Sequence, residues 1–224
     1  MNYSEEMALI DLFDDYSQWE TAGEDTQYRI KFNEDTKEAI VAFYGSNSKS
    51  DWIADLSFWK KPYKRMSTTF YVHAGFLKRW KVARDTVMDK LESLEPKSIT
   101  VVGHSYGGAV ALLCMEDCWF RFIHSREGKE DSLKGKIRCI TFGAPRILGI
   151  YNYKKIKERW EGTVEYFNGS DIITCVPPKY FLYRHPVKRT HIGEKYSFSK
   201  MLFHSKDYHS IWRYRDTFEK ESES

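Results

Sequence analysis

Hydrophobic positions change their spacing several times along the chain, which is typical of a fold that mixes helices and strands. Between Met7 and Trp19 they recur at near-helical spacing, so we expect an amphipathic helix there that ends at Gly23. Two strand-like runs follow at 27–32 and 39–44, joined by a polar hairpin loop. The second run is apolar on both faces, as a central strand of a sheet is.

The rest of the chain alternates between predicted helices and predicted strands. After a loop-rich stretch at 45–71, the pattern predicts helices at 74–94, 109–122, 153–160 and 203–218, strands at 99–102, 137–142 and 164–167, and a loop or β excursion at 177–196. Strands that alternate with helices imply parallel pairing through right-handed crossovers. The expected fold class is therefore α/β, with a central, mostly parallel sheet flanked by helices.

The length and composition of the chain are those of a single folded domain. A chain of 224 residues fits a single domain, 1–224, and its contents of 42% hydrophobic, 16% aromatic and 30% charged residues are those of a globular protein. The charged end at 219–224 is expected to fray. The net charge of +3 is too small to indicate a nucleic-acid partner. No apolar run approaches the ~18 residues of a transmembrane helix.

The four cysteines fall inside predicted core elements and are too scattered for a disulfide scaffold, so we expect all of them to be reduced. Cys114 and Cys118 share a helix face, but no second pair of Cys or His stands at metal-ligand spacing, so packing is favoured over a metal site. The first six residues are acidic and do not resemble a signal peptide. Together these features predict a reducing, cytoplasmic setting.

The strongest chemical motif is the segment Gly103-His104-Ser105-Tyr106-Gly107. It follows a short apolar strand and precedes a helix, which is the context of a nucleophile elbow. Glycines are needed there because side chains would collide with the neighbouring strand and helix. Ser105 is thus the predicted nucleophile.

A serine nucleophile needs a base to take its proton and a carboxylate to orient that base. Asp171 lies just past the end of a predicted strand, where such sheets collect their functional loops, whereas its rival Asp131 sits in a solvated segment. His124 ends the helix after the elbow, which carries it away from Ser105. Four later histidines remain as the base: His185, His191, His204 and His209.

With these residues in place, the chain resembles the class 3 lipase family, whose fungal triacylglycerol lipases have an α/β-hydrolase fold. The resemblance extends from about residue 27 to 212 and rests on seven blocks in one order. They are Ala42 to Ser46, Asp51 to Leu56, Val72 to Phe76, Gly103 to Ala109, Thr141 to Arg146, Asn168 to Pro178, and His191 to Gly193.

The resemblance reduces the number of candidates for the acid and the base of the triad. The family places its acid in an Asn-x-x-Asp segment ahead of a Pro-Pro pair, which Asn168 and Asp171 match. It has a structural histidine in a His-x-Gly segment, which His191 matches, so His191 is removed as a base. The family's catalytic histidine comes last, ahead of an aromatic residue, which favours His209 over His204.

The resemblance also implies an oxyanion hole made by the backbone amide of Tyr106 and by the amide and hydroxyl of Ser46. Such donors bind the charge that grows on the tetrahedral oxygen. Tyr44 stands where the family often has arginine, so the local charges differ here. The family's signal peptide and disulfides are missing, which argues against secreted fat digestion but not against hydrolysis.

Residues 57–70 occupy the place of the family's lid. Their bulky apolar groups beside four cations suit either transient contact with an anionic lipid interface or a solvated loop with anchored aromatic residues. Tyr180, Phe181 and Tyr183 could line an acyl groove, although core packing is the simpler interpretation.

The expected function is serine-dependent carboxylic ester hydrolysis through an acyl-enzyme on Ser105, with lipid acyl esters as the substrates, as in a triacylglycerol lipase or a phospholipase A1. No metal or cofactor is expected. A short-chain carboxylesterase would use the same residues, as would a peptidase or amidase. An inactive hydrolase-fold binding module is the alternative from another class. The sequence does not indicate an oligomeric state.

Overall fold

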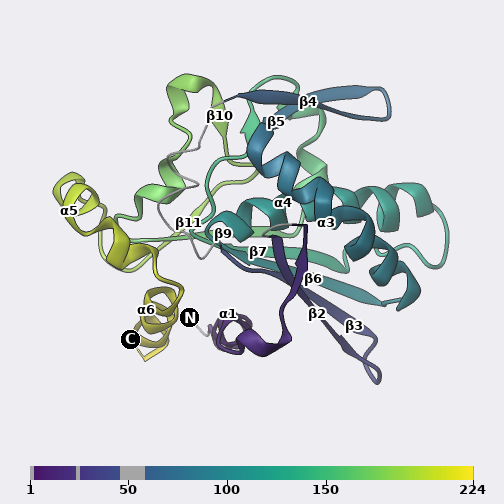
Figure 1. Ribbon diagram of the computed structural model, residues 1–224, viewed down its shortest axis with the longest axis horizontal. Coiled ribbons are helices and arrows are strands. Elements are labelled where there is room, and N and C mark those ends of the chain that lie inside the picture. The colour runs from purple at the N-terminus through teal and green to yellow at the C-terminus, as the bar shows by residue number, and fades with distance from the viewer. Residues whose placement is uncertain (1–2, 24–25, 46–58, 224) are drawn as a thin grey trace.

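The computed structural model describes residues 3–23, 26–45 and 59–223, with all of their side chains except those of residues 16 and 202–206 (Figure 1). Its main sheet has seven strands in the spatial order β1-β2-β3-β6-β7-β9-β11. They are β1 Glu20–Ala22, β2 Thr26–Asn33, β3 Glu38–Phe43, β6 Ser98–His104, β7 Ile137–Phe142, β9 Thr163–Asn168 and β11 Thr190–Ile192. From β3 to β11 all neighbours are parallel, and β1 and β2 form an antiparallel edge.

Helices cover both faces of this sheet (Figure 1). The α-helices are α1 Ser4–Ile10, α3 Ala74–Ser93, α4 Tyr106–Cys118, α5 Phe198–His209 and α6 Ile211–Glu223. Short 3₁₀ helices are η1 Asp11–Phe13, η2 Tyr16–Gln18, η4 His124–Arg126, η5 Tyr153–Lys155, η6 Lys157–Trp160, η7 Ile172–Cys175 and η8 Lys179–Phe181, and a π-helical turn, η3 Trp119–Ile123, extends α4. In the described ranges no helix has the length and apolarity needed to span a bilayer.

Side chains of successive residues on the central strands pack into two separate hydrophobic cores, one on each face of the sheet. On β3, Val41 and Phe43 join the cluster under α3 and α4, whereas Ala42 joins the cluster under α1 and α6. On β6, Val101 and Val102 divide in the same way. Side chains alternate across a strand, so a strand buried on both faces must be apolar throughout. The prediction of a central strand at 39–44 is therefore confirmed.

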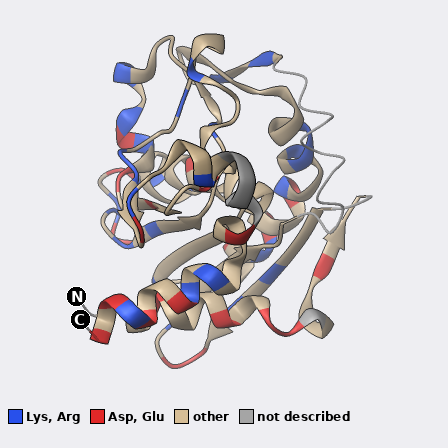
Figure 2. Cartoon of the chain, turned by 90° about the vertical axis from the view of Figure 1, so that its left-hand side faces the viewer, with Lys and Arg blue, Asp and Glu red and all other residues tan. Residues whose placement is uncertain are grey.

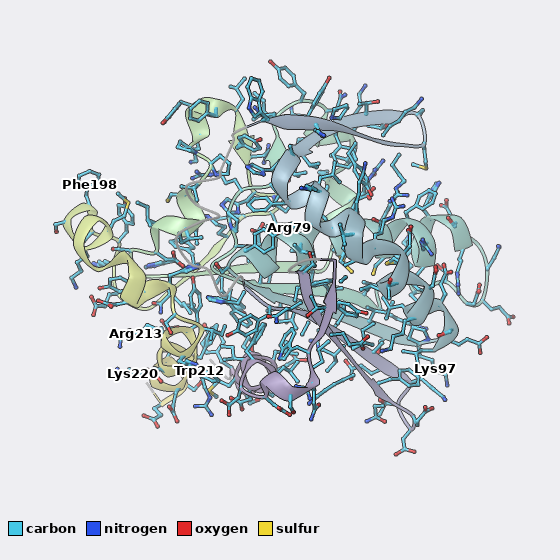
Figure 3. All side chains as sticks on the ribbon, viewed as in Figure 1. Arg79, Lys97, Phe198, Trp212, Arg213 and Lys220 are labelled. Atoms are coloured by element: carbon cyan, nitrogen blue, oxygen red, sulfur yellow. The ribbon has the colours of Figure 1, made fainter. Side chains whose placement is uncertain are left out.

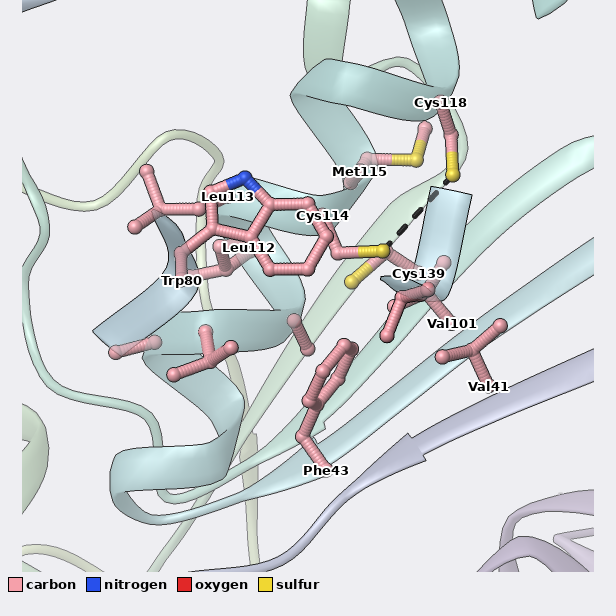
Figure 4. Close-up of a cluster of buried hydrophobic side chains, with 14 of the residues drawn as sticks. Val41, Phe43, Trp80, Val101, Leu112, Leu113, Cys114, Met115, Cys118 and Cys139 are labelled. Atoms are coloured by element: carbon pink, nitrogen blue, oxygen red, sulfur yellow. Dashed lines mark hydrogen bonds between the residues drawn. The ribbon is translucent and has the colours of Figure 1, made fainter. Parts of the chain in front are cut away.

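The buried cysteines belong to the core under α3 and α4 (Figure 4). The Sγ atoms of Cys114 and Cys118 lie 4.0 Å apart on successive turns of α4, and Cys139 is equally buried. All four cysteines are free thiols, and burial raises the pKa of Cys114 and of Cys139. Within the described ranges, no group of three or more His, Cys, Asp or Glu side chains is placed to hold a metal ion. Cys114, Cys118 and Cys139 thus pack in the core, whereas Cys175 is partly exposed.

A second, four-stranded sheet lies above the first in Figure 1. Its order is β10-β8-β5-β4, with β4 Lys60–Arg65, β5 Thr68–His73, β8 Leu148–Gly149 and β10 Tyr183–Arg184. The described part of the stretch predicted as a loop or lid at 57–70 is therefore mainly a hairpin. The sequence hid it because β4 is an edge strand rich in lysine and containing Pro62, the composition that protects sheet edges but lacks a strand pattern.

The hairpin is tied to α4 by buried charges. Asp117 accepts hydrogen bonds from the hydroxyl of Tyr63 on β4, at 3.0 Å, and from the indole of Trp80 on α3, at 2.7 Å. The guanidinium of Arg65 forms ion pairs with both Asp117 and Glu116, whose side chains are buried. Removing one partner from such a group costs about 3–5 kcal/mol, because a buried charge is left uncompensated. These contacts anchor β4 to the helix that follows the elbow.

Both ends of the chain differ from the predictions. The N-terminal helix ends at Ile10 and does not run to Gly23. Farther along, the Asp15 carboxylate accepts the backbone N–H of Ser17, a contact that competes with helical hydrogen bonding, and β1 follows at Glu20–Ala22. The predicted C-terminal helix is two helices that meet at Ser210. The predicted frayed end is helical up to 223, and the Glu221 carboxylate accepts the backbone N–H of Gly193. The segment 153–160 forms two 3₁₀ turns in place of one helix.

His73 caps the N-terminus of α3 as a neutral ring. Its Nδ1 accepts the backbone N–H groups of Gly75, at 3.2 Å, and Phe76, at 3.5 Å. Burial lowers its pKa from 6.5 to about 4. Between these pH values the imidazole is protonated in the unfolded chain and neutral in the folded chain. The free energy of unfolding is therefore at its full value above pH 6.5 and decreases as the pH falls towards 4. This decrease in the free energy of unfolding is on the order of 3 kcal/mol.

Replacing His73 by asparagine, which also caps helices, is expected to flatten the pH dependence of unfolding. Urea unfolding of both proteins at several pH values between 4 and 7 measures the difference in free energy between them. That difference should shrink as the pH falls, because only the wild type loses stability through this ring. A difference that stays constant over the whole range would contradict the assignment.

Candidate active site

The nucleophile elbow adopts a sharp and strained turn. Ser105 has φ 57° and ψ −127°, a conformation that costs a non-glycine residue on the order of 1–3 kcal/mol. Its backbone N–H donates to the carbonyl of Phe142 on β7 at 2.9 Å, and its carbonyl accepts from Gly108 at 3.0 Å. These bonds hold the turn between β6 and α4, so that the serine Oγ stands at the carboxyl end of the sheet.

Glycines make this turn sterically possible. A Cβ on Gly103 would lie 2.4 Å from the carbonyl oxygen of Gly107. A Cβ on Gly107 would lie 2.2 Å from the carbonyl oxygen of Phe43 on the neighbouring strand. Both distances fall far below van der Waals contact, and both clashes involve backbone that cannot swing away. The elbow therefore requires glycine at both positions.

The structure brings Ser105, His209 and Asp171 into one hydrogen-bonded chain. The Nε2 atom of His209 lies 2.7 Å from the Oγ of Ser105, and its Nδ1 lies 2.8 Å from Oδ2 of Asp171. The residues come from three elements far apart in sequence, namely the elbow, the loop after β9 and the end of α5. This is the geometry in which an imidazole removes a hydroxyl proton while a carboxylate holds it in position.

Asp171 is buried, and its carboxylate accepts three hydrogen bonds. Oδ1 accepts the backbone N–H of Ile173 at 3.0 Å, which caps η7. Oδ2 accepts the hydroxyl of Tyr214 at 2.8 Å, in addition to His209. Burial and the adjacent Asp171 carboxylate raise the pKa of Tyr214 well above its ordinary value, so this hydroxyl remains a donor. The carboxylate therefore has one orientation available to it.

His209 is held through its backbone as well as its ring. It is the last residue of α5, and Ser210 breaks the helix before α6 begins. The Nε2–H of His104, the residue just before the nucleophile, donates to the carbonyl of His209 at 2.7 Å. The two imidazole rings lie 5.0 Å apart, centre to centre. His104 thus links the elbow directly to the residue that approaches the nucleophile.

Gly143 gives the triad room. Its φ is +66°, and a Cβ there would lie 2.9 Å from Oδ2 of Asp171 and 3.0 Å from Nδ1 of His209. Any side chain at 143 would therefore push into the hydrogen bond between these two groups. The segment after β7 passes close to the triad because this residue is glycine.

The other histidines that follow the elbow are placed elsewhere. His185 is buried, with Nδ1 at 2.7 Å from Oε2 of Glu165 and Nε2 at 2.9 Å from the carbonyl of Thr174. His191 lies on β11 and packs its ring against Phe167. The backbone of His204 lies in the middle of α5, and its side chain is outside the described part of the structure.

The two candidates that the sequence disfavoured also lie outside the triad. The ring of His124 stacks on Trp119, with the ring centres 5.2 Å apart. The carboxylate of Asp131 is exposed and pairs with Arg126 at 3.0 Å. Neither makes a contact with Ser105 or His209 among the described interactions.

The predicted oxyanion hole is only partly described. Tyr106 is the first residue of α4, so its backbone amide stands at the positive end of the helix dipole, immediately after the nucleophile. Ser46 lies outside the described residues. The preceding Gly45 does lie beside the nucleophile, since a Cβ on it would be 3.3 Å from Cβ of Ser105. The oxyanion role of Ser46 and Tyr106 stays a prediction.

Three residues of the site were not found from the sequence. His104 could have been noticed as a polar ring inside the elbow motif itself. Gly143 could have been noticed as a glycine directly after a buried strand. Tyr214 carried no signal, because an aromatic residue at helical spacing predicts core packing rather than a hydrogen bond to a carboxylate.

Replacing Tyr214 by phenylalanine is expected to lower kcat on a soluble ester about tenfold, with little change in KM. The substitution removes one of two donors to Oδ2 of Asp171 and leaves the backbone N–H of Asn168, which Tyr214 accepts at 3.1 Å, without that partner. A hydrogen bond to a charged group contributes about 1.5–3 kcal/mol. Steady-state kinetics and a thermal unfolding curve measure the two effects separately.

Tyr166→Phe provides a matched control. The hydroxyl of Tyr166 also donates to a carboxylate, that of Glu6 on α1, at 2.8 Å, and makes no described contact with the triad. Its loss should affect stability and leave kcat near that of the wild type. Equal kcat values for the two variants would show that Tyr214 has no part in positioning Asp171.

Comparisons with known proteins point to one family. Residues 40–181 match the family described as Lipase (class 3). The lipase of Rhizomucor miehei is 31% identical over 193 residues, an alignment that covers 80% of this chain and 46% of the relative. Phospholipase A1-Igamma1, chloroplastic, of Arabidopsis thaliana is 25% identical over 178 residues, covering 67% of this chain and 33% of the relative.

The solved structure of the native Rhizomucor miehei lipase propeptide complex superposes with a TM-score of 0.63 and 28% identity, covering 78% of this chain and 55% of that one. The chain thus spans between about a third and about half of the length of these relatives. The predicted α/β-hydrolase fold and the predicted family are confirmed. On the match over more than half of its residues, the chain belongs to the class 3 lipase family.

Proposed function

We propose that this protein is a serine-dependent carboxylic ester hydrolase that acts on lipid acyl esters through an acyl-enzyme on Ser105. The observation that carries the proposal is the hydrogen-bonded chain from Asp171 through His209 to Ser105, with both heavy-atom distances below 3 Å. Family membership indicates which reaction such a hydrogen-bonded triad catalyses, since the relatives include enzymes named lipase and phospholipase A1.

In the first half of the reaction, Nε2 of His209 takes the proton of the Ser105 hydroxyl as Oγ attacks the ester carbonyl. The carbonyl π electrons move onto oxygen, and the amide of Tyr106 and the predicted donors of Ser46 stabilise that charge. Asp171 stabilises the imidazolium without accepting its proton. The tetrahedral intermediate then collapses, His209 protonates the leaving alkoxide, and the alcohol departs.

In the second half, water attacks the acyl-enzyme while His209 takes one of its protons. Collapse of the second intermediate releases the carboxylic acid, and the proton returns from His209 to Oγ of Ser105. Each residue thus ends in the state in which it began. The described geometry supports these proton transfers, since His209 faces the nucleophile with one nitrogen and the acid with the other.

A fluorophosphonate probe tests the nucleophile directly, because it forms a stable bond only with an activated serine. Labelling is expected at Ser105, located by peptide mass spectrometry, and should disappear in Ser105→Ala. An unlabelled wild type that is correctly folded would identify the protein as a binding module. Labelling at any other serine would also contradict the proposal.

The substrate class is tested with p-nitrophenyl esters of increasing acyl length, offered below and above their aggregation threshold. A higher rate on aggregated long-chain esters is expected for a lipid esterase. A preference for short soluble esters, with no rise on aggregates, would identify a carboxylesterase instead. Turnover of matched anilides at comparable rates would point to an amidase.

A further inference from the structure

Exposed hydrophobic side chains gather on the second sheet and on the loops that continue from it. Six of them, here called the apolar platform, come from three separate stretches of chain: Trp59, Tyr71, Ile150, Tyr151, Tyr180 and Leu182. Tyr180 is 77% exposed and Trp59 is 75% exposed, which is unusual for large aromatic residues. Contiguous exposed apolar groups of this kind mark interaction surfaces.

Contacts among these stretches make the platform one surface. The rings of Tyr71 and Tyr151 meet edge to face with their centres 6.5 Å apart. The backbone N–H of Ile150 donates to the carbonyl of Leu182 at 3.2 Å. Trp59 is joined to β10, because its carbonyl accepts the hydroxyl of Tyr183 at 3.0 Å.

The platform contains an open hollow of about 710 Å³, lined by Trp59, Lys60, Tyr71, Tyr151 and Asn152. The ammonium of Lys60 lies 4.4 Å above the ring of Tyr183 and donates to the carbonyl of Phe181. The lining thus combines aromatic faces with a cation.

The charge around the platform has a single sign. The three stretches that build it, 59–73, 143–157 and 172–193, contain twelve Lys and Arg residues and neither Asp nor Glu. The whole chain has 32 Asp and Glu among 224 residues, so stretches of this combined length would be expected to hold about seven. Figure 2 shows the same contrast, with acidic residues frequent on α1 and α6 at the lower end and the upper end mainly basic and neutral.

Several of these cations are exposed, and no acidic partner is described for them. Lys61, Lys154, Lys155 and Lys179 are all exposed. None of the four forms an ion pair with any residue that the structure describes. Each lysine close to an anionic membrane surface contributes roughly a fivefold increase in affinity, so a few such residues beside an apolar patch suffice for reversible binding.

The same loops also build the active site. The stretch 143–157 begins at Gly143 beside the triad, and 172–193 begins directly after Asp171. The guanidinium of Arg146 in the first stretch donates to the carbonyls of Cys175 and Pro177 in the second, the latter at 2.8 Å. A surface on these loops therefore lies on the side of the sheet where the triad stands.

We infer that the apolar platform and its lysines bind the surface of an anionic phospholipid membrane. The inference deepens the proposed function, and rests on it for the choice of lipid over nucleic acid. Exposed aliphatic groups such as Ile150 and Leu182 also favour lipid, because they offer a nucleic acid neither stacking nor charge. A second copy of this chain is disfavoured, because a self-complementary contact would bring lysines against lysines.

Vesicle co-sedimentation of the Ser105→Ala protein tests the inference without any hydrolysis. The vesicles are phosphatidylcholine alone, or phosphatidylcholine with about 30 mol% phosphatidylserine. Binding to the anionic vesicles is expected to be at least tenfold tighter, and to weaken as salt is raised. Equal affinity for both vesicle types, or no binding to either, would overturn the inference.

Charge-matched variants locate the surface. Replacing Lys61, Lys154 and Lys179 by glutamate should weaken binding to anionic vesicles on the order of 100-fold. The control reverses three exposed lysines elsewhere, Lys81, Lys97 and Lys220, of which the last two are labelled at the lower right and lower left of Figure 3. The control has the same net charge and should lose less than about threefold; an equal loss would overturn the assignment to the platform.

The apolar contribution has its own variant. Replacing Trp59 by alanine together with Tyr180 by serine should weaken binding at least tenfold, and thermal unfolding should stay unchanged because both side chains are largely exposed. Trp212→Ala, on α6, is the matched control and should bind like the parent. An unchanged affinity in the double variant would contradict a role for the aromatic residues.

Two further measurements distinguish membrane binding from nucleic-acid binding and from self-association. An oligonucleotide that binds more tightly than the vesicles, with the same lysine dependence, would assign the surface to nucleic acid. Self-association that the lysine variant abolishes would assign it to a second copy. Hydrolysis of a soluble ester by the lysine variant with Ser105 intact should match the wild type, so a failure of catalysis and a failure of membrane binding are read independently.

Discussion

Replacing His209 by alanine is expected to slow hydrolysis of a soluble ester by about 10⁴- to 10⁶-fold. The imidazole is within 2.7 Å of Oγ of Ser105, and the structure describes no other base within reach of that hydroxyl. Without it, the hydroxyl must lose its proton to water, and the leaving alkoxide must depart without a proton donor. Single-turnover and steady-state kinetics measure the loss, and the rate of fluorophosphonate labelling should fall with it.

His204→Ala is the matched control, because it removes the same ring from the same helix. Its activity is expected to stay near that of the wild type. The opposite pattern, with activity retained in His209→Ala and lost in His204→Ala, would overturn the choice between the two histidines. Circular dichroism and thermal unfolding of both proteins check that neither change acts by unfolding α5.

Replacing Gly107 by alanine is expected to destabilise the protein by more than about 4 kcal/mol, or to prevent folding at all. In an ordinary helix this change stabilises, because alanine has the higher helix propensity. Here the new Cβ would lie 2.2 Å from the carbonyl oxygen of Phe43 and 2.6 Å from that of Tyr44. Relief would require α4 to move away from β3, which would take the elbow with it.

Gly75→Ala is the control for this effect, since Gly75 also lies in the first turn of a helix. Its Cβ would meet only the ring of His73, at 3.2 Å, and no backbone. Urea unfolding should show a change of no more than about 1 kcal/mol for this variant. A Gly107→Ala protein of near-normal stability would contradict the close approach of α4 to β3.

The central part of the fold could be predicted because local pattern and tertiary role agree there. The strand at 137–142 was predicted with the bounds that β7 has, and the helix at 74–94 with nearly those of α3. Both elements bury a continuous apolar set, so their periodicity is strong. The order strand, elbow, helix also followed from glycines whose steric reason is local.

The parts that could not be predicted depend on partners distant in sequence. Strand β4 exists because Lys60 to Arg65 pair with β5 and because Asp117 on α4 binds Tyr63, and neither partner is visible in the strand's own composition. The break at Ser210 is similar, since two amphipathic helices in succession give one continuous helical pattern. The sequence therefore indicated which segments are apolar but not where helices change direction.

The candidate triad shows the same division. Ser105 followed from its own motif, and Asp171 from its place after a strand. His209 could be chosen among the late histidines only through the family resemblance, because nothing near it in the sequence indicates its distance to Ser105. Its position becomes clear only when α5 and β6 are placed together, as the 2.7 Å contact shows.

Helix α6 connects the end of the chain to the chemistry. It closes one core with Phe218, and the hydroxyl of Tyr214, one turn earlier on the same helix, holds the carboxylate of Asp171. Loosening of this last segment would release that carboxylate while the parallel strands were still paired. A temperature rise that loosens α6 should therefore lower the proposed hydrolytic activity before the whole chain unfolds, and a bulky group fused after residue 224 should lower kcat without touching the triad itself.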